Sequence, residues 1–396
     1  MTTPTKPFDE ATILAEAQAS AGLEGFGTDE FREPLRILLA ALAEAPLHAL
    51  GIQIMRNSVI WSLVSRLRAQ YWFDRHPEIA EEEIAAPLVV VGMMRSGTTL
   101  VQRLLASDRH HYSALGWEVG APAPTPGAWP ADPDPRIEAA ERQSSQTRRF
   151  APELFSIHPT YPLQAEEEIV FLADAFLSHI PEASCDVPGY RSWLDAQDFT
   201  PAYEYLRRML QLLQWQKKER GQKRDRWVLK TPAHLGYLGD LFAAFPEAQV
   251  IHMHRHPVET IASGASLNTT LWRLHSDAVD PRRVGEQWVE RMAWANDRAI
   301  AFRSGPQGRS ARFIDVWYAD AVSAPLDEAG RIYEAAGIDF DDETRRAMAT
   351  WLEENSQEKL GSHRYSPEDF GLRAEEIEER FAPYITRFIA PYTEPG

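Results

Sequence analysis

The segment PLVVVGMMRSGTTLVQRLL, residues 87–105, is the clearest indication of the fold, because within it an apolar strand passes through a short loop into an amphipathic helix. The valine-rich run Leu88–Val91 predicts a buried strand, and the apolar spacing over Thr98–Ala106 predicts the helix. A strand joined to a helix in this way is the usual unit of a parallel sheet. The stretch therefore predicts an α/β protein whose ligands bind where the strands end.

The loop inside this stretch nearly matches the phosphate-binding pattern G-x-x-x-x-G-K-[ST]. Gly92 and Gly97 occupy the two glycine positions, but Thr98 stands where the pattern requires lysine, and the nearest fixed charge is Arg95. That lysine reaches the β- and γ-phosphates of a nucleoside triphosphate, so its absence argues against hydrolysis of ATP or GTP. Backbone N–H groups and a helix N-terminus still favour a smaller anion, such as one phosphate bearing one sulfate. An ordinary corner between a strand and a helix is the alternative.

The rest of the chain alternates between strand and helix patterns. Further strands are predicted at residues 226–230, 248–255 and 311–318, and helices at residues 8–80, 165–180, 201–220, 234–245, 257–267, 325–336, 341–354 and 373–388. The alternation predicts a P-loop-like parallel β-sheet flanked by helices on both faces, with added N-terminal and C-terminal helices. Residues 1–85 are expected to form a helical extension packed on an α/β domain of residues 86–396, and the proline-rich segment 119–135 to form an irregular surface loop.

Composition narrows the classes of function. The chain has 396 residues, of which 44% are hydrophobic, and its 41 basic and 58 acidic residues give a formal net charge of 41 − 58 = −17. This balance argues against general nucleic-acid binding and gives no support for a polybasic membrane surface. Cys185 is the only cysteine, so an intramolecular disulfide and a thiolate metal cluster are excluded. The first residues lack the pattern of a signal peptide and no apolar run is long enough to span a membrane, so we expect a soluble, cytoplasmic protein.

The loop is similar to the 5′-phosphosulfate-binding loop of sulfotransferases that use 3′-phosphoadenosine 5′-phosphosulfate (PAPS), many of which have an R-S-G-T-T core. The matching residues here are Arg95, Ser96, Gly97, Thr98 and Thr99. The resemblance covers about residues 86–385 and implies a PAPS-dependent sulfotransferase. It implies PAPS as the cosubstrate, adenosine 3′,5′-bisphosphate as the product, and no required metal. The acceptor is not predicted beyond a hydroxyl of a small molecule, a lipid or a glycan, and no oligomeric state is predicted.

Later segments resemble further parts of the same family. In VIHMHRHPVETIASGASL, Arg255 precedes Ser263 by eight residues (263 − 255 = 8), as in the family's 3′-phosphate site. Arginine offers paired donors to phosphate oxygens, and serine adds a neutral donor. Lys230, at the end of the predicted strand RWVLK, matches the catalytic lysine that reaches the sulfuryl group, although a solvated lysine at a strand edge is the alternative. In EKLGSHRYSPEDFGL, the resemblance places His363 and Tyr365 near the nucleotide.

Sulfuryl transfer needs a group that takes the proton of the acceptor. Glu118 is the candidate base, because it follows Arg95 by 23 residues (118 − 95 = 23), close to the place of the catalytic glutamate in tyrosylprotein and glycan sulfotransferases. The resemblance thus gives catalytic roles to both Glu118 and Arg95. The cluster Glu166–Glu168 is a rival source of a base, and His158 and His234 are further candidates because many cytosolic members of the family use histidine.

Three histidines in the motif HMHRHP raise the question of a metal site, since His252, His254 and His256 alternate along a predicted strand. Alternation alone places such residues on one face of a strand, without any functional requirement. No familiar zinc spacing or carboxylate pattern accompanies them. We therefore predict no metal site.

Two alternatives to the transferase belong to other classes of function. A nucleotide-dependent kinase or NTPase with a degenerate loop would hydrolyse ATP in the presence of Mg²⁺. A non-catalytic protein that senses adenosine bisphosphate would bind that nucleotide tightly without transferring any group. The missing lysine at Thr98 is the sequence feature that disfavours the first alternative.

Overall fold

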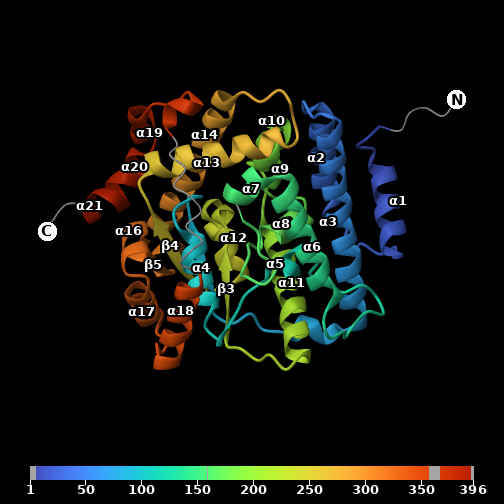
Figure 1. The fold of residues 1–396 in the computed structure, drawn as a ribbon, viewed down its shortest axis with the longest axis horizontal. Helices are drawn as coiled ribbons and strands as arrows, with labels where there is room; N and C mark the ends of the chain where they lie inside the picture. Colours follow the sequence, from blue (N-terminus) through green and yellow to red (C-terminus); the bar gives the residue numbers. More distant parts are fainter. Residues whose placement is uncertain (1–5, 158, 356–365, 394–396) are drawn as a thin grey trace.

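The structure, a computed structural model, describes residues 6–157, 159–355 and 366–393. At its centre lies a five-stranded sheet in the order β2–β3–β1–β4–β5, in which every pairing is parallel. The strands are β1 (Leu88–Gly92), β2 (His111–Tyr112), β3 (Arg226–Lys230), β4 (Gln249–His254) and β5 (Arg312–Trp317). Figure 1 shows this sheet surrounded by helices, so the predicted fold class is confirmed.

Strand β1 lies in the middle of the sheet and is buried along its whole length. Val89 and Val91 belong to the hydrophobic cluster on one face of the sheet, whereas Leu88 and Val90 belong to the cluster on the other face. A parallel strand that is covered by helices on both faces needs apolar side chains at successive positions. This requirement explains the run LVVV, which is the strongest strand signal in the sequence.

Helices from distant parts of the chain cover the two faces. The face that holds Leu88 packs against α4 (Thr98–Ala106), α17 (Pro325–Ala336) and α18 (Asp342–Glu354). The opposite face packs against α11 (Thr200–Glu219), α12 (Leu238–Ala244) and α14 (Pro281–Ser304). Helices α4 and α17 have the predicted bounds, whereas α14 was not predicted.

The N-terminal segment forms α1 (Glu10–Ala21), α2 (Arg32–Glu44), α3 (Ala49–Arg75) and the short 3-10 helix η1 (Pro77–Glu81). In Figure 1 the first three helices lie together along one side of the molecule. Their buried residues, including Ile13, Leu39 and Leu63, join the same hydrophobic cluster as Val89 of β1. The predicted N-terminal helices are therefore present, and they share a hydrophobic core with the sheet.

One predicted helix is mostly wrong. Within residues 165–180 only α8 (Ile169–Asp174) and the first residue of a later helix are helical, and Phe176 interrupts the segment with a left-handed φ of 58°. The preceding carboxylates, Glu167 and Glu168, point to the end of β3 instead, where both bond to the same residue. Tertiary contacts of this kind override a local helical pattern.

The remaining helical elements complete the fold. They are α5 (Gly116–Gly120), α6 (Pro135–Phe150), α7 (Pro152–Ile157), α9 (Ile180–Ser184), α10 (Pro188–Leu194), η2 (Pro232–Tyr237), α13 (Pro257–Arg273), α15 (Pro306–Ser310), α16 (Tyr318–Ser323), η4 (Pro367–Phe370), α19 (Ala374–Arg380), α20 (Ala382–Tyr384), η5 (Ile385–Ile389) and α21 (Ala390–Thr393). The proline-rich segment between α5 and α6 is irregular, as predicted. Helix α6 was not predicted, and a 3-10 helix, η2, replaces the start of the helix that was predicted at residues 234–245.

Candidate active site

The glycine-bounded loop joins β1 to α4 at the carboxyl end of the sheet. Gly92 (φ 152°) and Gly97 (φ 91°) have backbone angles that residues with side chains disfavour. A Cβ atom on Gly92 would lie 2.7 Å from the carbonyl oxygen of Met253, and one on Gly97 would lie 2.8 Å from the ring of Tyr318. Arg95 also has a positive φ, 74°, although it bears a side chain. The tight path of the loop therefore requires both glycines.

The hydroxyl residues of the loop differ in their surroundings. Ser96 is fully buried, and both its Oγ (2.6 Å) and its backbone N–H (3.1 Å) donate to the carbonyl oxygen of Met93. These bonds shape the turn, so contact between Ser96 and the cofactor stays a prediction. Thr98 and Thr99 begin α4, where the first N–H groups of a helix lack intrahelical acceptors. Such a helix N-terminus favours an anion.

The two predicted nucleotide sites meet at one wall. The Nε of Arg95 donates a 3.1 Å hydrogen bond to the Oγ of Ser263 on α13. The Nη1 of Arg255 donates a 3.0 Å hydrogen bond to the carbonyl oxygen of Arg95, and its guanidinium lies 4.0 Å from the centre of the Tyr318 ring. Arg255 also pairs with the exposed Glu259 at 2.7 Å. The loop between β1 and α4 and the turn between β4 and α13 thus form one connected basic surface.

Lys230 lies at the end of β3 and is only 1% exposed. Its Nζ donates to the Oγ1 of Thr99 at 3.2 Å and to the Oε1 of Glu167 at 2.5 Å. The alternative of a solvated lysine is therefore wrong. A buried ammonium needs such paired partners, because an unpaired charge is costly to bury. Lys230 therefore connects the first turn of α4 to Glu167.

The neighbouring carboxylate, Glu168, has a different environment. It is 1% exposed, and it accepts the backbone N–H of Lys230 at 3.0 Å and pairs with the Nε2 of His234 at 2.8 Å. The other ring nitrogen of His234 lies 2.7 Å from the hydroxyl of Tyr203. Burial raises the pKa of Tyr203 well above its usual value, so the phenol stays protonated. Its O–H group donates a hydrogen bond to the imidazole. With both nitrogens engaged, His234 is poorly suited to take an acceptor proton.

Glu118 lies in α5 and is 4% exposed. Its two carboxylate oxygens pair with the Nζ of Lys217 at 2.5 and 2.7 Å, and it accepts the backbone N–H of Leu115 at 2.9 Å. These donors hold the carboxylate in a buried salt bridge, which disfavours proton transfer to it from an outside substrate. Its role as the base stays a prediction, and the contacts of Glu118 do not support it. The candidates His158, His363 and Tyr365 lie outside the described residues.

A cavity of about 210 Å³ lies against the loop. It is lined by Met94, Arg95, Gly97, Thr98, Thr99, Glu167, Pro232, Arg255, Leu267 and Tyr318. Two guanidinium groups, two hydroxyls and a helix N-terminus thus face one space, which fits the phosphate and sulfate groups of PAPS. Of the carboxylates considered as a base, Glu167 lines this cavity and Glu118 does not.

A second cavity, of about 110 Å³, adjoins the first. The two cavities share Met94, Glu167 and Pro232 in their linings. Pattern reasoning missed this second space and also missed Tyr318, which follows β5 at the edge where the other strands end. The rule that ligands bind at the carboxyl ends of parallel strands is the signal that could have identified Tyr318.

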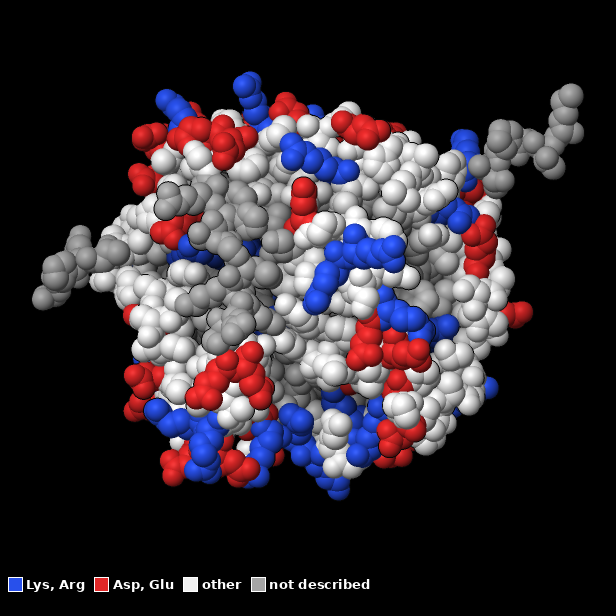
Figure 2. Space-filling model, viewed as in Figure 1, with Lys and Arg blue, Asp and Glu red and all other residues white. Residues whose placement is uncertain are grey.

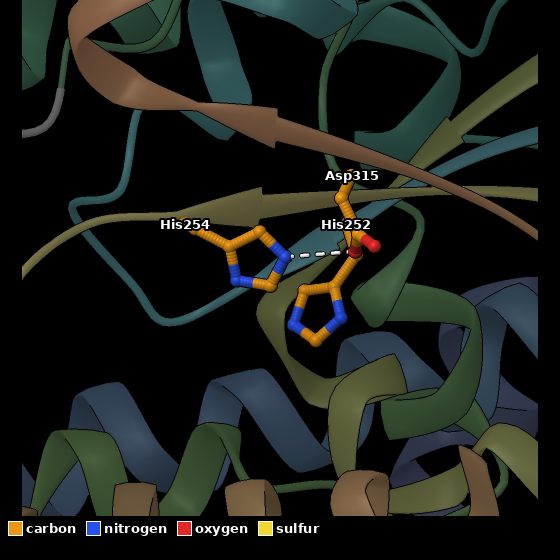
Figure 3. A group of neighbouring side chains, drawn as sticks. All are labelled: His252, His254 and Asp315. Carbon is orange, nitrogen blue, oxygen red and sulfur yellow. Dashed lines mark hydrogen bonds and ion pairs between the residues drawn. The ribbon is translucent and has the colours of Figure 1, made fainter. Parts of the chain in front are cut away.

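Two of the three alternating histidines form a cluster with Asp315, drawn in Figure 3. Their potential ligand atoms lie within 4.8 Å of one another. Arg303 already binds Asp315 through both terminal nitrogens (2.6 and 2.8 Å) and donates to the Nδ1 of His252 at 2.9 Å. Although burial alone would raise the pKa of Asp315, Arg303 and His254 hold it well below its usual range. A guanidinium among the ligand atoms repels a metal ion, so the geometry favours a network that braces β4 against β5.

Comparisons with known proteins show which proteins this chain resembles. The sulfotransferase family profile matches residues 87–342. The omega-hydroxy-beta-dihydromenaquinone-9 sulfotransferases Stf3 of Mycobacterium bovis and Mycobacterium tuberculosis are each 26% identical over 328 residues, covering 78% of this chain and 77% of each relative. Sulfotransferase STF1 from Mycobacterium tuberculosis H37Rv has a similar structure, with a TM-score of 0.83, 33% identity and coverage of 96% of this chain and 100% of that chain. For sulfotransferase STF9 from Mycobacterium avium the TM-score is 0.86, with 25% identity and 98% coverage of each chain.

Within the part of the chain that the structure describes, no helix is both long and apolar enough to cross a membrane. The kinase and NTPase alternative is not favoured, because the family profile includes the loop whose lysine position is taken by Thr98. The profile covers well over half of the chain, and the likeness to STF1 extends over nearly all of it. The chain belongs to the sulfotransferase family and is an enzyme of that class.

Proposed function

We propose that this sulfotransferase uses PAPS and that Glu167 is its general base. One observation carries the proposal. The Nζ of Lys230 touches both Thr99 of the phosphate-binding loop and Glu167, at the wall of the cavity that the loop forms. A cation for the leaving group and a base for the acceptor therefore lie side by side, as in-line transfer requires.

The nucleotide would be held by the connected basic surface. The loop residues and the N-terminus of α4 would bind the 5′-phosphosulfate, with Arg95 supplying charge. Arg255 and Ser263 would bind the 3′-phosphate, and Arg255 would exchange its exposed partner Glu259 for that group. The contacts among Arg95, Arg255 and Ser263 support this assignment, because they join the two phosphate sites into one surface.

The chemistry follows from the placement of these groups. The acceptor hydroxyl oxygen forms a bond to sulfur while the bond from sulfur to the 5′-phosphate oxygen breaks. Glu167 takes the hydroxyl proton, and the electron pair of the broken bond leaves with the phosphate, which gives adenosine 3′,5′-bisphosphate. Lys230 stabilises the negative charge that develops on the bridging oxygen. Every step uses side chains of this chain and needs no metal.

The acceptor class is supported by the relatives. The Stf3 proteins are named for an omega-hydroxy menaquinone derivative, which is a lipid. We propose that this chain likewise acts on a hydroxyl of a lipid or an apolar small molecule. The similarity covers most of both chains, but the identity of 26% permits a different acceptor within that class.

Transfer of ³⁵S from labelled PAPS to a panel of apolar alcohols, phenols and glycans tests the proposal. We expect labelled product from at least one apolar alcohol or phenol, in the presence of EDTA. Absence of any labelled product, together with no binding of adenosine 3′,5′-bisphosphate, would overturn it. Binding of the bisphosphate with an empty acceptor screen would favour the non-catalytic sensor instead.

A further inference from the structure

We propose that the second cavity is an acceptor chamber that selects an uncharged alcohol with a slim aliphatic reacting end. The inference rests on the proposed function and adds the shape and charge of the acceptor. The chamber has a volume of about 110 Å³ and is lined mainly by residues of α8, α9, η2 and α14. It shares Met94, Glu167 and Pro232 with the cavity at the loop. A hydroxyl at the shared wall would therefore meet the proposed base on the side facing the donor.

The walls of the chamber are mainly apolar. Ile169, Ile180, Trp288, Met292 and Trp294 contribute most of the bulky side chains. Its volume is below the roughly 150 Å³ of an apolar cavity that holds benzene. A flexible hydrocarbon chain fits such a space better than a fused ring system or a bulky cage does. Burial of that chain would also stabilise the complex in proportion to the apolar area removed from water.

The charged residues that line the chamber already have ion-pair partners: Glu167 pairs with Lys230, and Glu182 pairs with Arg291. The Oε1 of Glu182 lies 2.6 Å from the Nδ1 of His179 and 2.6 Å from the Nε of Arg291. Arg291 also pairs with Asp195 at 2.7 Å, and the Nε2 of His179 lies 2.9 Å from the hydroxyl of Tyr237.

Because Glu182 and Arg291 already have counter-ions, a charged acceptor would lose its hydration without gaining a free one. A sugar would likewise leave several hydroxyls without partners against the apolar wall. Although burial alone would raise the pKa of Glu182, its contacts with His179 and Arg291 lower it to about 2. Glu182 therefore stays ionised and paired near neutral pH. At such pH values the chamber favours uncharged acceptors.

The first part of the test varies the acceptor at a constant reacting group. 1-Octanol, 1-adamantanemethanol and methyl glucoside each offer a primary hydroxyl, but they differ in width and polarity. With ³⁵S-labelled PAPS, we expect kcat/KM for 1-octanol to exceed that for either of the others by about tenfold or more, the discrimination that shape alone supplies in an apolar pocket. Equal or better transfer to 1-adamantanemethanol or methyl glucoside would overturn the inference while leaving the proposed function standing.

The second part of the test fills the chamber. Ala183→Leu on α9 and Ala295→Leu on α14 each add bulk to its lining. Ala183 is partly exposed, so its substitution preserves the fold even where that of the buried Ala295 does not. The matched control is Ala301→Leu, which changes an exposed residue of the same helix α14 outside the chamber.

We expect Ala183→Leu to reduce kcat/KM for 1-octanol by about tenfold, within the range that a few methylenes change in an apolar pocket. The affinity of Ala183→Leu for adenosine 3′,5′-bisphosphate should stay equal to that of wild type. For Ala301→Leu, both this affinity and kcat/KM for 1-octanol should equal the wild-type values. Normal transfer by folded Ala183→Leu would contradict the chamber. An enzyme that transfers to no acceptor and binds no bisphosphate would instead contradict the proposed function.

Discussion

At the scale of single residues, the choice of base depends on what each carboxylate already contacts. Both glutamates pair with a buried lysine, Glu118 with Lys217 and Glu167 with Lys230, but only Glu167 also lines the space beside the loop. Sequence spacing favours the first glutamate, because it measures distance along the chain from Arg95. Three-dimensional contacts favour the second, because they show which carboxylate faces the reacting groups. The two assignments make opposite predictions for the matched substitutions to glutamine.

Glu167→Gln should lower transfer by about 10²–10⁴-fold, the usual contribution of a positioned general base. Its affinity per folded molecule for adenosine 3′,5′-bisphosphate should change little, because the amide keeps the shape of the side chain, although Lys230 loses its counter-ion and the variant loses stability. Glu118→Gln is the matched control. It should retain transfer per folded molecule but lose about 3–5 kcal/mol of unfolding free energy, because Lys217 would stay buried without its counter-ion. Loss of transfer by a stable Glu118→Gln enzyme, with normal transfer by Glu167→Gln, would return the role of base to Glu118.

Lys230→Ala should differ from Glu167→Gln when the acceptor is an acidic phenol that is already ionised. An ionised phenol needs no base, so it should partly restore transfer in Glu167→Gln. It should not restore transfer in Lys230→Ala, because the charge on the leaving oxygen still lacks its ammonium partner. The comparison measures the ratio of kcat/KM for the phenol and a simple alcohol in each variant. Equal rescue of both variants would mean that Lys230 serves the base rather than the leaving group.

At the scale of elements, the sequence predicted those parts that local patterns determine. The apolar run predicted β1 to within one residue and the apolar spacing predicted the bounds of α4, because both elements are buried in the core on a regular period. The segment at residues 165–180 failed, because Glu167 and Glu168 bond to β3, which is far away in the sequence. The order of Arg95, Lys230 and Arg255 along the chain likewise predicted one site, whereas the adjoining apolar chamber depends on four elements that no local pattern relates.

The contact between α3 and α8 predicts that the stability of the protein depends on pH. Asp174 is fully buried at the end of α8, where the Oγ of Ser65 on α3 donates to it at 2.6 Å. Burial raises the pKa of Asp174 from 3.8 to about 7, in spite of this bond and the nearby Arg66. The folded state therefore holds a proton that the unfolded state releases, and this group makes stability fall as pH rises from about 4 to about 7.

Asp174→Asn removes this proton linkage. Relative to wild type, its unfolding free energy should therefore rise by about 1.4 kcal/mol per pH unit between pH 4 and 7 and level off above that range. Urea denaturation at a series of pH values measures the difference. Asp327→Asn, at a position where the side chain is 80% exposed, is the control and should give a flat difference. A flat difference for Asp174→Asn as well would mean that its carboxyl is ionised in the folded protein.

At the scale of the whole molecule, the hydrophobic core joins the N-terminal helices to the sheet. Ile13, Leu39 and Val89 belong to one continuous cluster, so removal of the first helices would expose apolar side chains of α8, α10 and α11, against which they pack. We expect one cooperative unfolding transition in calorimetry, with a calorimetric enthalpy equal to the van't Hoff enthalpy. Two resolved transitions would mean that residues 1–85 fold as a separate unit.

The distribution of charge supports a small-molecule or lipid acceptor over a polyanion. On the face drawn in Figure 2, acidic and basic side chains are intermixed and form no continuous basic band. The formal net charge of −17 acts in the same direction, since it repels an extended polyanion at long range. The basic residues that matter for the proposed chemistry, Arg95, Lys230 and Arg255, instead gather around the loop at the carboxyl end of the sheet.

Calorimetric titration of the wild-type enzyme with adenosine 3′,5′-bisphosphate in EDTA, beside the same titration with adenosine 5′-monophosphate, tests the central claim most directly. We expect metal-independent binding of the bisphosphate and weaker binding of the monophosphate, which lacks the 3′-phosphate. In Arg255→Ala the bisphosphate should lose about 2 kcal/mol of binding free energy, the cost of a charge-assisted pair, while the monophosphate loses much less. Equal affinity of the wild-type enzyme for both nucleotides, or no binding of the bisphosphate without Mg²⁺, would contradict the account.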